Sequence, residues 1–273
     1  MTLFLKDEDV AQCVTMDGML EAIESMQQHY GDGQAHNMTR RKIIADSGML
    51  SVMGGGLFHM GLLGVKTYTV VKGSYSFQVS LYDANTGELL LYTQANRLGQ
   101  LRTGASTGVT VKHLANAGDV TVGIIGTGGQ APTQLEAVSK VRNIKSIKAF
   151  SRTLDRREAF ASKMTETMGI DVSAAATNEE AVRDCDIVLC VAATMDPVVE
   201  GGWLKDGSTV IGAGPTTWRA REVDEATIAR ADKIIVDSTE QAAIEAGDIC
   251  NAVDKGLIQW SKVHELRHVV SGA

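Results

Sequence analysis

The chain has 273 residues, of which 44% are hydrophobic and 22% charged, and it carries a formal net charge of −7. This length predicts one large domain or two ordinary ones, at roughly 100–200 residues per domain, and the composition excludes long disordered stretches. The negative charge excludes a nucleic-acid partner of the usual kind, because such proteins present a basic face.

Nothing in the sequence predicts a membrane or an export route. No run of about 18 apolar residues occurs, and residues 1–7 lack the basic-then-apolar pattern of a signal peptide. The four cysteines form no CxxC pair, which argues against a disulfide framework. No metal site is expected either, since His264 and His268 lie four residues apart without an evident third ligand. We therefore expect a cytoplasmic protein.

The first third predicts a mixed α/β region. Asp7 and Thr15 are suited to cap two helices, the second running to about Tyr30. Residues 83–87 have the composition of a hairpin turn between two strands. A helix rich in small residues follows at 97–114. The strand-like runs are residues 41–45, 49–53, 63–71, 77–82 and 88–95.

From residue 120 the pattern alternates between short apolar runs and amphipathic stretches. Such alternation predicts a doubly wound parallel sheet of the Rossmann type. We place this dinucleotide-binding domain at residues 116–248. Residues 1–115 with the tail 249–273 then form an α/β substrate-binding and dimerisation domain. The expected strands are 120–125, 146–150, 171–174, 187–192, 208–212 and 233–237, and the expected helices are 129–141, 154–168, 179–184 and 224–229.

A glycine-rich turn follows the first of these strands and reads Gly126-Thr127-Gly128-Gly129-Gln130-Ala131. Between an apolar strand and an amphipathic helix, this pattern predicts a dinucleotide site. Gly126 permits the tight turn, Gly128 lets a pyrophosphate approach the backbone, and Ala131 allows close packing of helix on strand. Pro132 fits the first turn of a helix, where its missing N–H is not needed.

The second strand ends in Ser151-Arg152-Thr153, without the acid that usually holds the ribose hydroxyls of NAD. These residues are suited to a 2′-phosphate, with Arg152 supplying a charged fork. We therefore expect NADP(H) to be preferred over NAD(H). The predicted cofactor site also includes Thr103, Ala193, Thr194 and Gly212.

Several blocks together resemble the ornithine cyclodeaminase/mu-crystallin family, over nearly the whole chain. The Gln-Ala ending of the glycine turn and the block Arg102-Thr103-Gly104-Ala105 are the most specific pair. The other matching blocks are Leu63-Gly64-Val65-Lys66, Leu81-Tyr82-Asp83, Thr86-Gly87-Glu88-Leu89, Leu98-Gly99-Gln100-Leu101, Pro197-Val198, Trp203-Leu204-Lys205-Asp206-Gly207 and Arg221-Glu222-Val223-Asp224.

The resemblance implies a homodimer built through the first domain, and a small amino or imino acid as substrate. It implies that Lys66 is catalytic beside the reacting carbon and that Arg102 grips the α-carboxylate. Arg40 or Arg41 would be the second carboxylate contact, with Arg40 preferred. Elementary chemistry agrees, because a guanidinium holds a carboxylate through two parallel hydrogen bonds and a buried lysine can shuttle a proton.

Two features of this chain depart from the pattern of the family. Thr216, which we assign to the substrate-binding residues, aligns with the catalytic Asp of ornithine cyclodeaminases, and a threonine is no base near neutral pH. Relatives also usually continue for some tens of residues past the position of Ala273, with a last segment near the nicotinamide.

We therefore expect an NAD(P)H-dependent reductase of 2-imino acids or cyclic ketimines, which in reverse is an amino-acid dehydrogenase. One alternative is an ammonia-releasing cyclodeaminase with bound NAD. The other is a protein that binds NADPH and a small ligand without turnover.

Overall fold

The computed structural model describes residues 1–214 and 216–272, and the chain divides into two compact units. Residues 1–102 together with those from 267 onward form the first unit, and residues 103–266 form the second. The boundary between the units falls inside helix α3 (Asn96–Leu114), which runs without a break from the first unit into the second. The sequence pattern had placed the two transitions near residues 116 and 249.

The first unit is built on one six-stranded sheet in the order β1-β6-β5-β4-β3-β2. Strands β2 to β6 form an antiparallel meander, and β1 pairs with β6 in parallel. The five predicted strands are present, with most ends extended by a few residues, whereas the three-residue β1 was not predicted. The strands are β1 (Leu3–Leu5), β2 (Ala35–Ala45), β3 (Gly48–Leu57), β4 (Leu62–Val71), β5 (Ser74–Asp83) and β6 (Leu89–Gln94).

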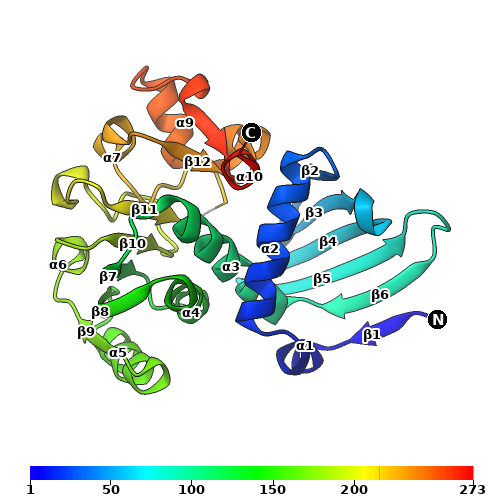
Figure 1. Cartoon of the computed structure of the whole chain (residues 1–273), viewed down its shortest axis with the longest axis horizontal. Helices are drawn as coiled ribbons and strands as arrows, with labels where there is room; N and C mark the ends of the chain where they lie inside the picture. Colours follow the sequence, from blue (N-terminus) through cyan, green and yellow to red (C-terminus); the bar gives the residue numbers. More distant parts are fainter. Residues whose placement is uncertain (215, 273) are drawn as a thin grey trace. The chain divides into compact units, whose positions relative to one another are not determined.

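Two helices precede the meander, α1 (Asp7–Cys13) and α2 (Met16–Gly31), and α2 lies against this sheet (Figure 1). Thr15 caps α2 as predicted, since its hydroxyl accepts a hydrogen bond from Gly18 N at 3.2 Å. The predicted cap at Asp7 is wrong, because Lys6 is the residue that precedes α1. The Asp7 carboxylate instead accepts the Arg97 N–H at 3.0 Å and so caps the start of α3.

The predicted hairpin turn between β5 and β6 is confirmed. Asp83 Oδ1 accepts hydrogen bonds from the backbone N–H groups of Asn85 at 2.8 Å and Thr86 at 2.9 Å. Gly87 closes the turn at φ +74°, in the left-handed region that favours glycine. The 3₁₀ turn η1 (Phe58–Met60) joins β3 to β4.

The second unit contains a five-stranded sheet in the order β11-β10-β7-β8-β9, with every pair parallel. Because β8 lies on one side of β7 and β10 on the other, the winding reverses at β7, as in a Rossmann fold. The predicted fold class is thereby confirmed. The strands are β7 (Asp119–Ile125), β8 (Asn143–Phe150), β9 (Asp171–Ala174), β10 (Ile187–Cys190) and β11 (Thr209–Gly212).

Helices cover both faces of this sheet (Figure 1). Ile187 and Leu189 belong to a core shared with α3, α4 (Ala131–Val141) and α5 (Leu154–Met168). Val188 and Cys190 belong to a second core with α6 (Asn178–Val182). This alternation along β10 explains why the strand reads as a continuous apolar run.

The predicted strand 233–237 does not continue the five-stranded sheet. It forms β12 (Ile234–Val236), which pairs in parallel with β13 (Val263–Glu265) in a separate small sheet. Within the described residues, no helix is long and apolar enough to cross a membrane. The other elements of the second unit are η2 (Gly201–Trp203), α7 (Glu225–Arg230), α8 (Thr239–Glu245), α9 (Gly247–Asp254) and η3 (Trp260–Lys262). The last helix, α10 (Leu266–Ser271), belongs to the first unit from Arg267 onward.

Candidate functional site

The glycine turn lies between β7 and α4, as the sequence predicted. Gly126 adopts φ +104°, and a Cβ there would lie 2.6 Å from the carbonyl oxygen of Val191. Only glycine fits this position. A Cβ at Gly128 would meet no atom of the described residues within 4 Å, so its backbone is open to a ligand, while Ala131 is fully buried under the sheet core. The turn therefore has the shape that a pyrophosphate requires.

The amino end of α4 supplies the complementary charge. Gln130 precedes the helix and its side chain does not cap the first turn. The N–H groups of such a first turn carry partial positive charge and have no partner within the helix. Thr127 and Gly129 complete the turn, and Gly129 is exposed. These residues fit the phosphates of a dinucleotide.

Ser151, Arg152 and Thr153 follow the end of β8, and Arg152 and Thr153 are exposed. Arg157 holds this loop in place. It donates a hydrogen bond to Ser151 O at 3.4 Å, and its guanidinium carbon lies 5.1 Å from the ring centre of Phe150. The first acid after the strand is Asp155, in the first turn of α5. No carboxylate of residues 151–154 therefore repels an anion bound at Arg152.

The remaining predicted cofactor residues lie in α3 and at the ends of β10 and β11. Thr103 is half-buried in α3. Ala193 is exposed, and the Thr194 hydroxyl donates to Asp196 O at 2.7 Å. Gly212 ends β11, and Thr216 is exposed beyond it. Because Val191 lies against Gly126, the segment after β10 and the glycine turn share one edge of the sheet.

Lys66 lies in the middle of β4, directly opposite Met53 on β3 and Val79 on β5. Directly opposed residues point to the same face of a sheet, and Tyr68, two residues on, shares that face and is 6% exposed. The Lys66 ammonium lies 5.2 Å from the ring centre of Phe77 and 5.8 Å from that of Tyr68. Lys66 is thus set among aromatic rings on the covered face.

Arg40 reaches the same place through a bulge in β2. The register shifts between Met38 and Arg41, so two residues of β2 lie opposite Met53. The Arg40 Nε donates to Met53 Sδ at 3.5 Å, and its guanidinium lies 5.9 Å from the Tyr68 ring centre. Arg41 is exposed and pairs with Val52 on the other face.

The electrostatics bring Arg102 into the same group. Burial and, to a smaller extent, the positive charges of Arg102 and Arg40 together lower the pKa of Lys66 to about 7. Arg102 is half-buried near the start of α3 and follows Leu101, which is fully buried. Three cations therefore converge in the first unit, and such a group attracts a carboxylate.

Glu222 belongs to the block Arg221-Glu222-Val223-Asp224, in which the sequence predicted no site residue, and it is 1% exposed. Its carboxylate accepts hydrogen bonds from Ala192 N at 2.8 Å and Gly214 N at 2.9 Å. Burial raises its pKa to about 8. No pattern in the sequence distinguishes a buried acid of this kind from a solvated one next to Arg221.

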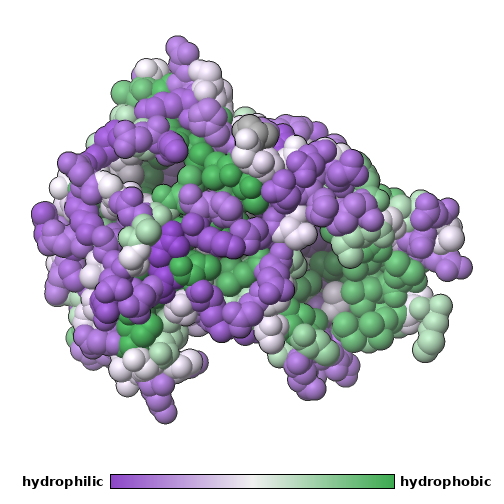
Figure 2. Space-filling view, in the orientation of Figure 1, coloured by the Kyte–Doolittle hydropathy of each residue, from purple (hydrophilic) through white to green (hydrophobic). Residues whose placement is uncertain are grey.

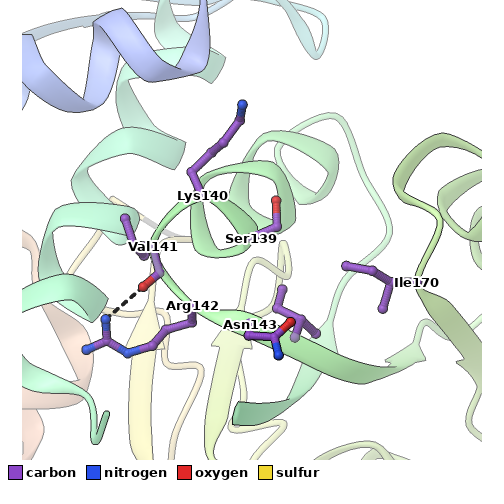
Figure 3. A pocket seen from close by; sticks show the side chains of 7 residues that line it. Ser139, Lys140, Val141, Arg142, Asn143 and Ile170 are labelled. Carbon is purple, nitrogen blue, oxygen red and sulfur yellow. Dashed lines mark hydrogen bonds between the residues drawn. The ribbon is translucent and has the colours of Figure 1, made fainter. Parts of the chain in front are cut away.

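A separate open depression of about 450 Å³ lies where β8 begins, at the end of the sheet away from the glycine turn (Figure 3). Arg142, in its wall, donates to the carbonyl oxygens of Val111 and Ala115 at 2.9 Å each, at the end of α3. Its guanidinium is occupied in capping that helix. The depression is not part of the candidate site.

Comparison with known proteins agrees with the motifs. The chain is 35% identical over 218 residues to the Delta(1)-pyrroline-2-carboxylate reductase of Bacillus cereus, covering 77% of this chain and 67% of that protein. It also resembles the solved structure of the Thermococcus litoralis Delta(1)-pyrroline-2-carboxylate reductase in complex with NADH and L-proline. That likeness has a TM-score of 0.94 and 30% identity, and covers 99% of this chain and 87% of that one.

An archaeal alanine dehydrogenase dimer with bound NAD is similar as well, with a TM-score of 0.92 and 31% identity over 99% of this chain and 85% of that one. The model of the ornithine cyclodeaminase/mu-crystallin family matches residues 1–273. The resemblance stated from the sequence is thus confirmed, and the chain belongs to the ornithine cyclodeaminase/mu-crystallin family.

Proposed function

We propose that this protein is an NAD(P)H-dependent reductase of 2-imino acids or cyclic ketimines, which in reverse oxidises an amino acid. Named relatives that are reductases or dehydrogenases of imino and amino acids support the reaction class. The observation that carries the proposal is the convergence of Arg40, Lys66 and Arg102 in the first unit.

The two arginines are assigned to the substrate carboxylate. Each guanidinium can donate two parallel hydrogen bonds to it, which fixes the substrate's orientation as well as its position. Arg40 rather than Arg41 is assigned to this role, because Arg41 belongs to the other face of the sheet. The substrate class that fits is a small carboxylic acid with a C=N bond next to the carboxylate.

Lys66 is assigned to the proton at the substrate nitrogen. Its pKa of about 7 leaves it poised between the amine and the ammonium form at neutral pH. A bound carboxylate neutralises charge on Arg40 and Arg102, so the pKa of Lys66 rises and its ammonium form can donate to the imine nitrogen. The dinucleotide, when bound, supplies the hydride that the carbon receives.

The cofactor is assigned to the edge formed by the glycine turn and the ends of β8, β10 and β11. The structural relatives described above bind NADH or NAD. For this chain we propose a preference for NADP(H), because Arg152 follows β8 where a ribose-binding acid is absent. Arg102, assigned to the substrate, and Thr103, assigned to the cofactor, are consecutive residues of α3.

A homodimer is proposed through the sheet of the first unit, over which hydrophobic residues gather (Figure 2). Pairing places Met38, Val65, Tyr92 and Phe4 on the face opposite Lys66. Phe4 is 68% exposed there and Leu63, on the same face, 44%. An apolar face of this kind is suited to self-association, and the archaeal relative is a dimer.

Changing Leu63 to Glu should convert the dimer to a monomer in sedimentation velocity. Leu154→Glu is the control, since Leu154 is 50% exposed on α5 of the second unit. A dimer that persists in the Leu63 variant excludes this face.

The test of function follows NADPH and NADH absorbance with Δ1-pyrroline-2-carboxylate, and with pyruvate plus methylamine. Oxidation that requires the imine supports the reductase. Ammonia release from ornithine without net cofactor change would instead support the cyclodeaminase alternative. Tight dinucleotide binding without either reaction would support a binding protein.

A further inference from the structure

Glu222 joins two segments that are far apart in sequence. Oε1 accepts the N–H of Ala192, two residues past the end of β10, and Oε2 accepts the N–H of Gly214, two residues past the end of β11. A carboxyl oxygen can accept in either protonation state, whereas an amide nitrogen cannot. Both oxygens are therefore used in fixing the backbone of these two segments.

The surroundings pack closely around the carboxyl group of Glu222. A Cβ at Gly214 would lie 2.4 Å from Glu222 Oε1 and 2.5 Å from Ala192 O, so the glycine admits the carboxyl group by lacking a side chain. The backbone of Glu222 is held in turn by Asp248, whose Oδ1 accepts the N–H groups of Glu222 at 2.8 Å and Val223 at 2.9 Å. Holding a buried acid so firmly at 1% exposure costs desolvation free energy.

The position of this bridge within the sheet indicates what it serves. Residue 192 follows Val191, whose carbonyl lies against Gly126 of the glycine turn. In a sheet that reverses at β7, one half of a dinucleotide lies over the β8 side and the other over the β10 side. The half on the β8 side carries the adenine ribose, near Arg152. The nicotinamide half is therefore expected to lie over the segments after β10 and β11, which Glu222 joins.

We propose that Glu222 is a positioning residue for the nicotinamide half of the dinucleotide. It fixes the backbone after β10 and β11, which includes the predicted cofactor residues Ala193 and Gly212. The inference rests on the proposed dinucleotide site, and it makes no use of the imine reaction. Binding alone can test it, so it can fail while the reductase assignment stands, and the reverse.

The experiment compares Glu222→Gln with the wild type by calorimetry, using NADH against ADP-ribose and NADPH against 2′-phospho-ADP-ribose. The shorter ligands lack the nicotinamide. We expect the dissociation constant of the full dinucleotide to rise about tenfold or more, equivalent to about 1.4 kcal/mol. The dissociation constants of the shorter ligands should change by no more than about twofold, which corresponds to well under half of about 1.4 kcal/mol. Glu225→Gln, a change in the first turn of α7, should alter neither.

Gly214→Ala disturbs the same hydrogen-bonded bridge, because the added Cβ would displace the Glu222 carboxyl group. This variant tests the proposal by the same binding measurement if the Glu222 variant does not fold. Gly202→Ala is its control, because a Cβ there meets no described atom within 4 Å. Selective loss of the full dinucleotide in the Gly214 variant supports the proposal. An unchanged dissociation constant, or an equal loss for full and shortened ligands, overturns it, since a general structural role would not separate them.

Discussion

Arg40 and Lys66 approach the same aromatic ring, with the guanidinium carbon 5.9 Å and the ammonium nitrogen 5.8 Å from the centre of Tyr68. Two cations at one ring attract the ring but repel each other. Their proximity is the consequence of the bulge in β2, which brings Arg40 opposite Met53 beside Lys66. The pair accounts in part for the low pKa of Lys66.

Arg40→Gln should therefore raise the pKa of Lys66 above about 7, because one of the positive charges that lower it is removed. In the proposed mechanism the ammonium form of Lys66 donates the proton during reduction, so kcat/KM should fall as pH rises through this pKa. The fall should occur at higher pH in the variant. The measurement is the pH profile of kcat/KM at saturating cofactor. Lys42→Gln, which removes an exposed charge from the same strand, should leave the profile in place, and an unshifted profile in Arg40→Gln would contradict the coupling.

Arg102→Lys keeps the positive charge but loses the planar fork that matches a carboxylate. The KM for Δ1-pyrroline-2-carboxylate should rise about tenfold or more, in line with the roughly 1.5–3 kcal/mol of a hydrogen bond to a charged group. The comparison substrate is Δ1-pyrroline, which has the C=N bond and no carboxylate. Its kcat/KM should change little. Equal losses for the two substrates would remove Arg102 from carboxylate binding.

Arg152→Ala should shift cofactor choice toward NADH. The guanidinium is exposed after β8, and the loss of one charge-assisted contact to a 2′-phosphate is worth about tenfold in KM for NADPH. The KM for NADH should stay within about twofold of the wild type, far below that loss. Arg156→Ala, an exposed arginine on α5, is the matched control. A ratio of NADPH to NADH efficiency that does not move would show that Arg152 is a solvated loop residue.

Glu222 should make folding stability depend on pH. Its pKa rises from 4.5 to about 8 in the folded chain, chiefly through burial. Between these values the folded state keeps a proton that the unfolded state releases, so the free energy of unfolding falls as pH rises, by up to about 1.4 kcal/mol per pH unit.

The glutamine of Glu222→Gln does not titrate. From pH 5 to pH 8 the free energy of unfolding of the wild type should therefore fall relative to that of the variant. Urea unfolding at several pH values measures it. For Glu225→Gln the difference should be constant over this range, because hydrogen bonding and pairing with Lys255 lower the pKa of Glu225 to about 2. A constant difference for Glu222→Gln as well would contradict the raised pKa.

Local patterns in the sequence were sufficient for the Rossmann unit. The glycine turn, the apolar strand before it and the helix after it lie within 25 residues, and hydrophobic periodicity over such a span depends little on the rest of the chain. The strand ends and the small elements from β12 onward were less predictable, since their pairing partners lie elsewhere. β12 is the example, because a three-residue strand can join any sheet that reaches it.

The sequence by itself determined the family, the fold class and the residue types at the candidate site: lysine and arginines for a carboxylate, and glycines for a dinucleotide. Only the tertiary structure decided which of two adjacent arginines lies with Lys66, because a bulge sets the face to which each points. It also decided that Glu222 is buried between two strand ends. Burial and register depend on contacts between distant segments, and a charge acquires its unusual pKa only when those contacts exclude water.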